Sequence, residues 1–291
     1  MVKAIDIVVN LWTTEVTANY PPHLDEFWDL MASSRGLDKF AGNDTTQKGI
    51  PVEDEIAEMD RAGVEKGLLL ATTGGDVGSA IFFEKHIDII HRTCQQHPDR
   101  FKGIVGINPS KILEWLAKLD RAVSEYGFVG AHIYPHWFGK APDHRVYYPF
   151  YARCAQLGVP VQIQVGHSMQ WFLETVAPPI LLDKIAIDFP TLKIIGIHTG
   201  HPWTEEMISV AWKHKNVYIG TDAHAPRYWD PSLVRFLNSR GQDKVLFGTD
   251  WPIIGFGRAI DEIDALELKD GPKQKLLRDN AIRVYGLENW V

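Results

Sequence analysis

The sequence predicts an α/β fold of the (β/α)8 or TIM barrel class, with a cover insertion after the first strand. Short apolar segments typical of buried strands alternate with segments of helical periodicity along the 291 residues, which is the pattern of a parallel sheet. We count eight strand-like segments, and eight strand–helix units in about 250 residues are what such a barrel requires. Because the composition does not change along the chain, we expect one barrel domain over residues 1–291.

The predicted strands are short apolar runs, and residues 10–50 interrupt the alternation after the first of them. This excursion is rich in aromatic, proline and polar residues, so we expect it to cover the mouth of the barrel. The segment 72–78, TTGGDVG, lacks the phosphate-loop motifs and is interpreted as an ordinary loop. The eight strands are Ala4–Val9, Lys66–Leu70, Gly103–Ile107, Val129–Tyr134, Pro160–Val165, Leu192–Ile197, Val217–Gly220 and Val245–Gly248.

Amphipathic segments between the strands predict the helices. In the first of them, Pro51 precedes apolar residues at helical spacing, namely Val52, Ile56 and Met59, and Gly63 ends the pattern. Two helical stretches after Gly257 close the chain. The remaining predicted helices are Ala80–His97, Ile112–Tyr126, Tyr147–Leu157, Pro179–Asp188, Glu205–His214 and Pro231–Ser239.

Composition and charge favour a small-molecule partner. The net charge is −7 and the basic residues are dispersed, so neither nucleic acid nor an anionic membrane is an expected partner. The amino terminus lacks the features of a signal peptide, and no apolar run is long enough to cross a bilayer. These observations predict a cytoplasmic protein. Cys94 and Cys154 lie far apart in helical contexts and are interpreted as free thiols.

Asp250 is the first candidate catalytic residue. It lies in the stretch VLFGTDWP at 245–252, where a buried strand delivers a carboxylate to its carboxyl end. In a parallel barrel that end carries the functional groups. The alternative is a turn or helix-capping aspartate, which is the commoner use of Asp after a strand. Asp6, inside the first strand, is expected to act through structure.

Histidines and aromatic residues follow the other predicted strands. A single histidine at a strand end is more often structural than functional, but several that converge at one mouth could act together. We predict that His167 and His198 join Asp250 in catalysis. The residues predicted to bind substrate are His132, Tyr134, His136, Trp137, His201, Trp203, His224, Arg227 and Trp251, and Asp222 follows the seventh strand.

Two further residue types permit either of two interpretations. Six tryptophans follow strands, which predicts an aromatic pocket or, equally, loops anchored by large buried side chains; they are Trp12, Trp137, Trp171, Trp203, Trp229 and Trp251. Arg145 and Arg227 could bind a substrate carboxylate or phosphate, or form surface ion pairs.

The sequence resembles the amidohydrolase-related family, in the branch that includes aminocarboxymuconate-semialdehyde decarboxylase and the resorcylate-type decarboxylases. The resemblance runs over essentially the whole chain and is carried by Ile5-Asp6, GAHIYPHW at 130–137, His167, IIGIHTGHPW at 194–203, GTDWP at 248–252 and DNAIRVYGL at 279–287. It implies a (β/α)8 barrel that forms a homodimer or a higher homo-oligomer. It also implies that His167, His198 and Asp250 occupy the functional positions of strands five, six and eight.

One departure from the family concerns metal binding. The family's strand-one motif His-x-His should follow Ile5-Asp6-Ile7, but the residues there are Val8, Val9 and Asn10. Valine cannot coordinate a cation, and asparagine offers one neutral oxygen. We therefore expect no metal cofactor. If zinc or manganese were bound, its ligands would be His167, His198 and Asp250, with His132 as a fourth.

Three functions from two classes are consistent with these residues. The leading hypothesis is a hydrolase of an aromatic-derived carbonyl compound, such as a lactone, a thioester or a β-keto compound, in which Asp250 activates water while His167 and His198 polarise the carbonyl. The alternative is a decarboxylase of an aromatic or muconate-type acid. A catalytically inactive barrel that binds a ligand is the third.

Overall fold

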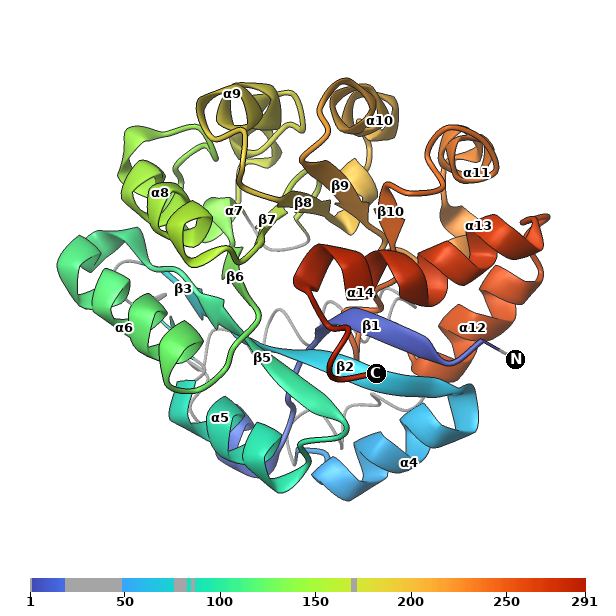
Figure 1. The fold of residues 1–291 in the computed structure, drawn as a ribbon, viewed down its shortest axis with the longest axis horizontal. Helices are drawn as coiled ribbons and strands as arrows, with labels where there is room; N and C mark the ends of the chain where they lie inside the picture. The colour runs from blue at the N-terminus through green and yellow to red at the C-terminus, as the bar shows by residue number, and fades with distance from the viewer. Residues whose placement is uncertain (1, 19–48, 76–82, 85–86, 169–171) are drawn as a thin grey trace.

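The computed structural model describes residues 2–18, 49–75, 83–84, 87–168 and 172–291, and eight parallel strands form its central sheet. Their order is β1-β2-β5-β6-β7-β8-β9-β10, so each strand lies beside its neighbour in sequence (Figure 1). The bounds are β1 Ala4–Val9, β2 Val64–Ala71, β5 Phe101–Gly106, β6 Gly130–Ile133, β7 Val161–Gln164, β8 Ile194–Ile197, β9 Val217–Gly220 and β10 Val245–Leu246. The eight predicted strands and the barrel class are thus confirmed.

Hydrogen bonds between the last and first strands close the barrel. Ile7 N donates to Phe247 O at 3.1 Å, and Asp250 N donates to Val8 O at 3.0 Å. An isolated parallel bridge then pairs Val9 with Trp251. Closure brings the carboxyl ends of the first and eighth strands together.

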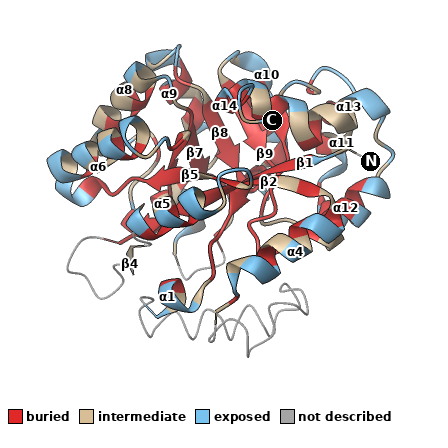
Figure 2. Cartoon of the chain, turned by 60° about the horizontal axis from the view of Figure 1, so that its bottom comes forward, coloured by how far each residue is buried: buried red, intermediate tan, exposed pale blue. Residues whose placement is uncertain are grey.

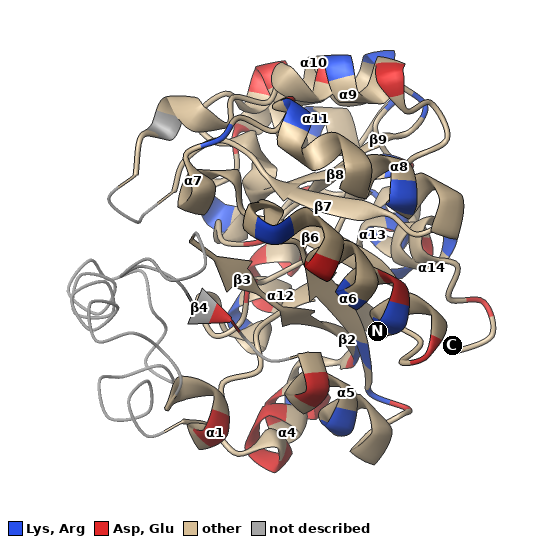
Figure 3. Cartoon of the chain, turned by 90° about the vertical axis from the view of Figure 1, so that its left-hand side faces the viewer, with Lys and Arg blue, Asp and Glu red and all other residues tan. Residues whose placement is uncertain are grey.

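Helices surround the strands, as Figure 1 shows. The helix α4 begins after Pro51 with three acidic residues in its first turn and ends at Gly63, whose φ of 75° is the left-handed conformation that favours glycine. The other bounds are α1 Thr14–Thr17, α5 Ile87–Gln96, α6 Ile112–Ser124, α7 Pro135–Phe138, α8 Tyr148–Leu157, α9 Leu181–Asp188, α10 Thr204–Lys213, α11 Pro231–Leu237, α12 Phe256–Asp264, α13 Asp270–Gln274 and α14 Asn280–Tyr285. Both signs of charge lie on these outer helices, whereas the strands in Figure 3 are mostly uncharged.

A small hairpin replaces part of one predicted helix. Thr73–Gly74 (β3) pairs antiparallel with Phe83–Glu84 (β4), so the helical prediction was wrong for Phe83–Glu84 and the loop prediction was wrong for Thr73–Gly74. The helix α5 begins at Ile87. Glu84 accepts from Lys118 Nζ of α6 at 3.1 Å, a tertiary contact that a local helical pattern cannot reveal. Most of the predicted cover lies outside the described residues, and its position stays a prediction.

The buried core has two layers, one between strands and helices and one inside the barrel. The inner layer includes Ile5, Ile7 and Leu68 and continues onto Val284 and Tyr285 of α14. The burial colouring of Figure 2 shows the strands almost wholly buried. Lys193, just before β8, donates to the carbonyl of Val284 at 2.7 Å, so α14 covers the amino-terminal end of the barrel. The opposite end is therefore the mouth.

Asp6 links β1 to the segment after β10. It is fully buried and accepts from Val8 N at 2.9 Å, Thr249 N at 3.2 Å and Thr249 Oγ1 at 2.6 Å. Burial raises its pKa from 3.8 to about 7, although these hydrogen bonds oppose the shift. The structural role predicted for Asp6 fits these contacts.

The raised pKa of Asp6 predicts a pH dependence of stability that the substitution Asp6→Asn should remove. Folding favours the neutral carboxyl, so the stabilisation is fully present below pH 3.8 and is lost as the pH rises through about 7. Asn cannot ionise and keeps the acceptor oxygen. The difference in unfolding free energy, variant minus wild type, should therefore rise between these pH values by an amount on the order of a few kcal/mol. Urea unfolding at several pH values measures it, and a difference that is constant with pH would contradict the prediction.

Candidate active site

Strained backbone marks the ends of three consecutive strands. His198 and Thr199 after β8, Ala223 after β9 and Asp250 after β10 have φ values of 68°, 56°, 64° and 58°, and they are the non-glycine residues with positive φ among those described. Each costs of order 1–3 kcal/mol and persists only where the surroundings enforce it. Such strain is typical of functional sites, so these turns mark the mouth as the candidate site.

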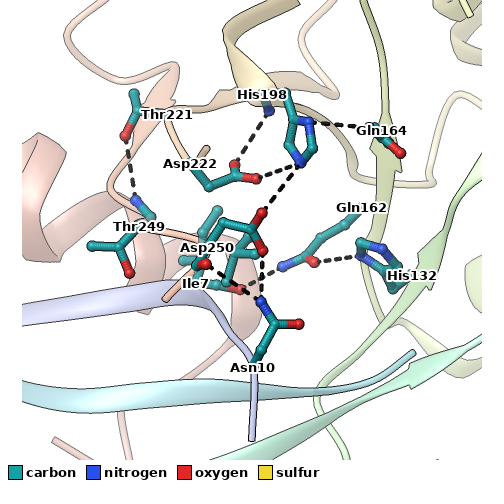
Figure 4. Close-up of polar contacts among 12 residues, drawn as sticks. Ile7, Asn10, His132, Gln162, Gln164, His198, Thr221, Asp222, Thr249 and Asp250 are labelled. Carbon is teal, nitrogen blue, oxygen red and sulfur yellow. Dashed lines mark hydrogen bonds and ion pairs between the residues drawn. The ribbon is translucent and has the colours of Figure 1, made fainter. Parts of the chain in front are cut away.

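His198 lies between two carboxyl groups (Figure 4). Its Nε2 is 3.3 Å from Asp222 Oδ2 and 4.0 Å from Asp250 Oδ2, and its backbone N donates to Asp222 Oδ1 at 3.3 Å. The side chains of His198 and Asp250 are 9% and 10% exposed, whereas that of Asp222 is 0% exposed. A ligand at the mouth could therefore reach His198 and Asp250, with Asp222 behind them.

Burial sets the protonation of this cluster. It lowers the pKa of His198 well below 6.5, helped by the neighbouring imidazoles of His224, His132 and His136. It also raises the pKa of Asp222 well above 3.8, helped by the charge of Asp250. The cluster thus combines an imidazole held toward its neutral form with a carboxyl group held toward its protonated form.

An amide that follows β1 holds Asp250. Asn10 Nδ2 donates to Asp250 Oδ1 at 2.7 Å and to Trp251 O at 3.0 Å. Because a main-chain carbonyl only accepts, the second bond fixes which amide atom faces the carboxylate. Asn10 therefore stands at the mouth as a hydrogen-bond donor.

Two glutamines of β7 face the barrel interior. Gln164 Nε2 lies 3.2 Å from His198 Nδ1. Gln162 Nε2 donates to Ile7 O at 2.7 Å, and its Oε1 lies 3.0 Å from His132 Nδ1. Gln162 therefore holds the ring of His132, which lies inside β6, through its Nδ1.

The remaining predicted histidines form a group beside the cluster. The ring of His201 lies 6.4 Å from that of His167 and 5.0 Å from that of His224, measured between centroids, and His224 lies 6.4 Å from His198. Burial, with His201 and His167 nearby, lowers the pKa of His224 to about 4. His167 therefore lies near the cluster, but Gln164 is the β7 side chain that contacts His198.

Aromatic residues line the side of the mouth that follows β6. Tyr134 lies edge-on to His132, with 4.3 Å between the ring centroids, and Trp137 lies 4.9 Å from Phe172. Trp203 is half-buried just before α10. His136 Nε2 bonds Gly166 O at 3.0 Å, a contact that ties α7 to the loop after β7.

Two predicted binding residues lie away from the cluster. Trp251 is fully buried, donates to Glu58 of α4 at 3.1 Å and stacks on Phe256 of α12, so it packs between the barrel and its helices. The side chain of Arg227 is 56% exposed and pairs with Glu262, which is the surface ion pair weighed as its alternative. Of the other tryptophans, Trp229 donates to His224 O at 2.8 Å, and Trp171 lies outside the described residues.

Sequence reasoning missed Asp222, Gln162 and Gln164 as site residues. Alternate residues of a strand share one face, so the pattern Gln-Ile-Gln at 162–164 places both amides on one side. That pattern could have identified Gln164 from its partner Gln162. Asp222 was noted as following the seventh strand but was given no role, because nothing in its local sequence separates it from a turn aspartate.

The donors at the mouth do not fit a metal ion. Within the described part of the chain, no three His, Cys, Asp or Glu side chains are arranged to hold one. Val8 is buried and apolar, and Asn10 presents N–H hydrogens, which repel a cation, to Asp250. We therefore assign no step to a metal.

A family model described as "Amidohydrolase" matches residues 20–287. Among the curated relatives, the gamma-resorcylate decarboxylase of Rhodococcus jostii (strain RHA1) is 25% identical over 258 residues, which cover 69% of this chain and 75% of that protein. The resemblance found in the sequence is thereby confirmed.

Solved structures share the fold. An uncharacterised TIM-barrel protein from Bordetella bronchiseptica superposes with a TM-score of 0.81 at 22% identity, covering 97% of this chain and 98% of that one. The 5-carboxyvanillate decarboxylase of Novosphingobium aromaticivorans, crystallised with manganese and a nitrobenzoic acid, has a TM-score of 0.73 at 19% identity, with 98% and 96% covered. Manganese is bound in that neighbour. Whether this chain can bind it depends on the donor atoms of its own residues.

The lowered histidine pKa values give a direct test of the site geometry. We expect the NMR resonances of His224 to titrate with a midpoint near pH 4, and those of His198 well below its ordinary 6.5, because burial disfavours both imidazolium ions. The variants His224→Gln and His198→Gln assign the resonances. A midpoint near 6.5 for either residue would show that its ring is solvated and the cluster is differently packed.

Proposed function

The chain belongs to the amidohydrolase family, and from this premise we propose that it is a lyase that removes the carboxyl group of a small aromatic acid. The observation that carries the proposal is the buried group of His198, Asp222 and Asp250, in which a carboxyl group whose pKa is raised by burial stands 3.3 Å from an imidazole at the mouth. Decarboxylation needs such a proton source, because carbon must be protonated where the carboxyl group leaves.

The likeness to two decarboxylases of aromatic acids supports this choice. It favours the decarboxylase alternative over the hydrolase that the sequence alone placed first. Aromatic side chains on the β6 side, Tyr134 and Trp137 among them, would contact the faces of a substrate ring. The imidazoles of His167, His201 and His224 would offer hydrogen-bond donors to its oxygen atoms.

The proposed reaction begins at the substrate hydroxyl. Asp250 accepts the hydroxyl proton of the aromatic acid, which increases electron density on the ring carbon that bears the carboxylate. Asp222, behind His198, transfers a proton to the imidazole, and the imidazolium then delivers that proton to the ring carbon. The bond between the ring carbon and the carboxyl carbon then breaks, its electron pair restores the aromatic ring, and CO2 leaves. Asp250 then returns the hydroxyl proton to the product, and Asp222 regains a proton from solvent. One proton thus replaces one CO2, and the step balances without an oxidant or a reductant.

Hydrolysis of an aromatic-derived carbonyl compound is the second candidate, and the exposure of the Asp250 side chain at the mouth favours it. The side chain is 10% exposed, so Asp250 could activate a water molecule while His198 polarises a carbonyl. The two reactions differ in product: hydrolysis consumes water and releases no CO2. The catalytically inactive barrel predicts binding without turnover.

The expected assembly and location of the protein also stay predictions. The family resemblance implies a homodimer or a higher homo-oligomer, and the sequence favours the cytoplasm. Among the described residues, the helices are too short or too polar to traverse a bilayer.

A substrate panel distinguishes the candidate reactions. We expect hydroxybenzoates to be turned over with release of CO2 and, in D2O, with deuterium at the carbon that lost its carboxyl group. Lactones and aryl β-keto thioesters should react slowly or not at all. Turnover of these carbonyl compounds without CO2 would favour the hydrolase, and binding of aromatic acids without any turnover would favour the inactive barrel.

Two isosteric variants test the residue roles. Asp250→Asn removes the proton acceptor and Asp222→Asn removes the proton source, so each should lower kcat by about 10²–10⁴-fold with the fold intact. The control is Asp188→Asn on α9, where the carboxylate bonds Tyr148 and Lys184 on the outer surface. Near-normal turnover in Asp250→Asn would remove that residue from the mechanism.

A further inference from the structure

The amides of Asn10 and Gln164 contact the two catalytic side chains from opposite sides. Asn10, just after β1, donates to Asp250 Oδ1 at 2.7 Å, and Gln164, at the end of β7, contacts His198 Nδ1 at 3.2 Å (Figure 4). Both amides are buried, with 8% and 2% of their surface exposed. They therefore act on Asp250 and His198 in a site from which most water is excluded.

The orientation of the Asn10 amide is determined by main-chain groups. Its Nδ2 also donates to the carbonyls of Trp251 at 3.0 Å and Asp250 at 3.4 Å, and a carbonyl cannot donate in return. A rotation that presented Asn10 Oδ1 to a cation would place that oxygen against two carbonyl oxygens. Asn10 is therefore a fixed donor, and it directs positive hydrogens at the carboxylate.

The two nitrogens of the His198 imidazole face different side chains, and of the two only Nδ1 has a hydrogen-bond partner among the described residues. Nδ1 faces the Gln164 amide, and Nε2 faces Asp222 Oδ2 at 3.3 Å. A metal ion needs a ring nitrogen with a free lone pair. At His198 Nδ1 it would have to displace the Gln164 contact, and at Asp250 it would have to displace the Asn10 hydrogen bond.

We propose that Asn10 and Gln164 take the place of a divalent cation, so that this site works without a bound metal. Asn10 is a positioning residue: its N–H offsets the charge of Asp250 and sets the orientation of the carboxylate. Gln164 orients the ring of His198. The activity readout below rests on the proposed function, whereas the cation-binding readouts do not depend on any substrate.

The first experiment measures cation binding by the wild-type protein. Elemental analysis of protein purified without chelator should find no stoichiometric transition metal, and MnCl2 or ZnCl2 should not raise its thermal midpoint. Turnover should be unchanged by a chelator. One manganese or zinc ion per chain, lost together with activity on chelation, would overturn the proposal.

The second experiment converts the donor of Asn10 into an acceptor. Asn10→Asp keeps the size of the side chain but places a second carboxylate against Asp250, and a cation is then the group that can join them. We expect this variant to gain a thermal shift with MnCl2 that the wild type lacks. Its activity without metal should fall about 10- to 100-fold, the loss expected for one hydrogen bond to a charged group.

The matched control is Asn216→Asp, which removes a half-buried amide at the other end of the barrel. Asn216 Nδ2 donates to the carbonyls of Phe189 and Leu192 at 3.1 and 2.9 Å. This variant should lose stability but gain no shift with MnCl2. An equal shift in both variants would mean that any added aspartate binds the cation, and it would overturn the assignment to Asn10.

Asn10→Ala keeps the proposal testable if Asn10→Asp does not fold. Without its donor, the carboxylate of Asp250 is less stable, so the acid limb of the pH–activity profile should move to higher pH. A variant with wild-type kcat and an unmoved profile would show that Asn10 does not position Asp250. If the panel contains no substrate, the proposed function fails, while the metal content and the thermal shifts still decide this inference.

Discussion

Closure of the barrel between its last and first strands is the constraint on which the site depends. Main-chain bonds join Asp250 N to Val8 O at 3.0 Å and Asn10 N to Trp251 O at 2.9 Å. They bring residues 240 positions apart into register, and the side-chain bond from Asn10 to Asp250 follows from that register. Because the strands are parallel, the remaining six strands also have their carboxyl ends at the same mouth. The left-handed backbone of Asp250 is held in place by these same bonds.

The interior of the barrel is divided along its axis. At the amino-terminal end, apolar side chains of the strands pack against α14 and contribute to stability in the ordinary way. Toward the mouth the interior becomes polar, and there each buried group has to find partners or change its protonation. Gln162 has three hydrogen-bond partners, namely Ile7 O, His132 and Tyr285. Asp6 and Asp222 are instead held toward their neutral forms by burial. Groups kept in an unusual protonation state cost stability, and they are the groups that can exchange a proton with a ligand.

The fold could be predicted from the sequence because it depends on repeated local patterns. Each of the eight strands is an apolar run with its own boundaries, so errors in one segment did not affect the others. The hairpin of Thr73–Gly74 and Phe83–Glu84 was missed because it depends on pairing between distant residues. Local sequence cannot show which partner a two-residue strand will find.

The site was predicted less completely, because residues near a strand end can point in different directions. Asp250 and Trp251 are neighbours, yet the first faces the mouth and the second packs against α4 and α12. His167 was predicted because it follows the fifth strand and matches the functional position that the family resemblance implies there, whereas the end of β7 determines that Gln164 contacts His198. Strand alternation was the available signal, and it is a better guide than residue type within a strand. Beyond the last strand residue the chain turns, and only the tertiary structure places the side chain.

Relatives of low identity keep the barrel because the residues at the mouth contribute little to holding it together. Substitutions there can change chemistry without changing fold, and Asn10 is such a case. The family resemblance leads one to expect a histidine in this part of the first strand. The amide of Asn10 does more than leave out its imidazole. The carbonyls of Trp251 and Asp250 accept its hydrogens and so deny it the orientation in which its oxygen could serve as a ligand. The main chain that closes the barrel therefore also decides what a side chain at this position can do, and the chemistry of the site has to be derived from the atoms that face Asp250 in this chain.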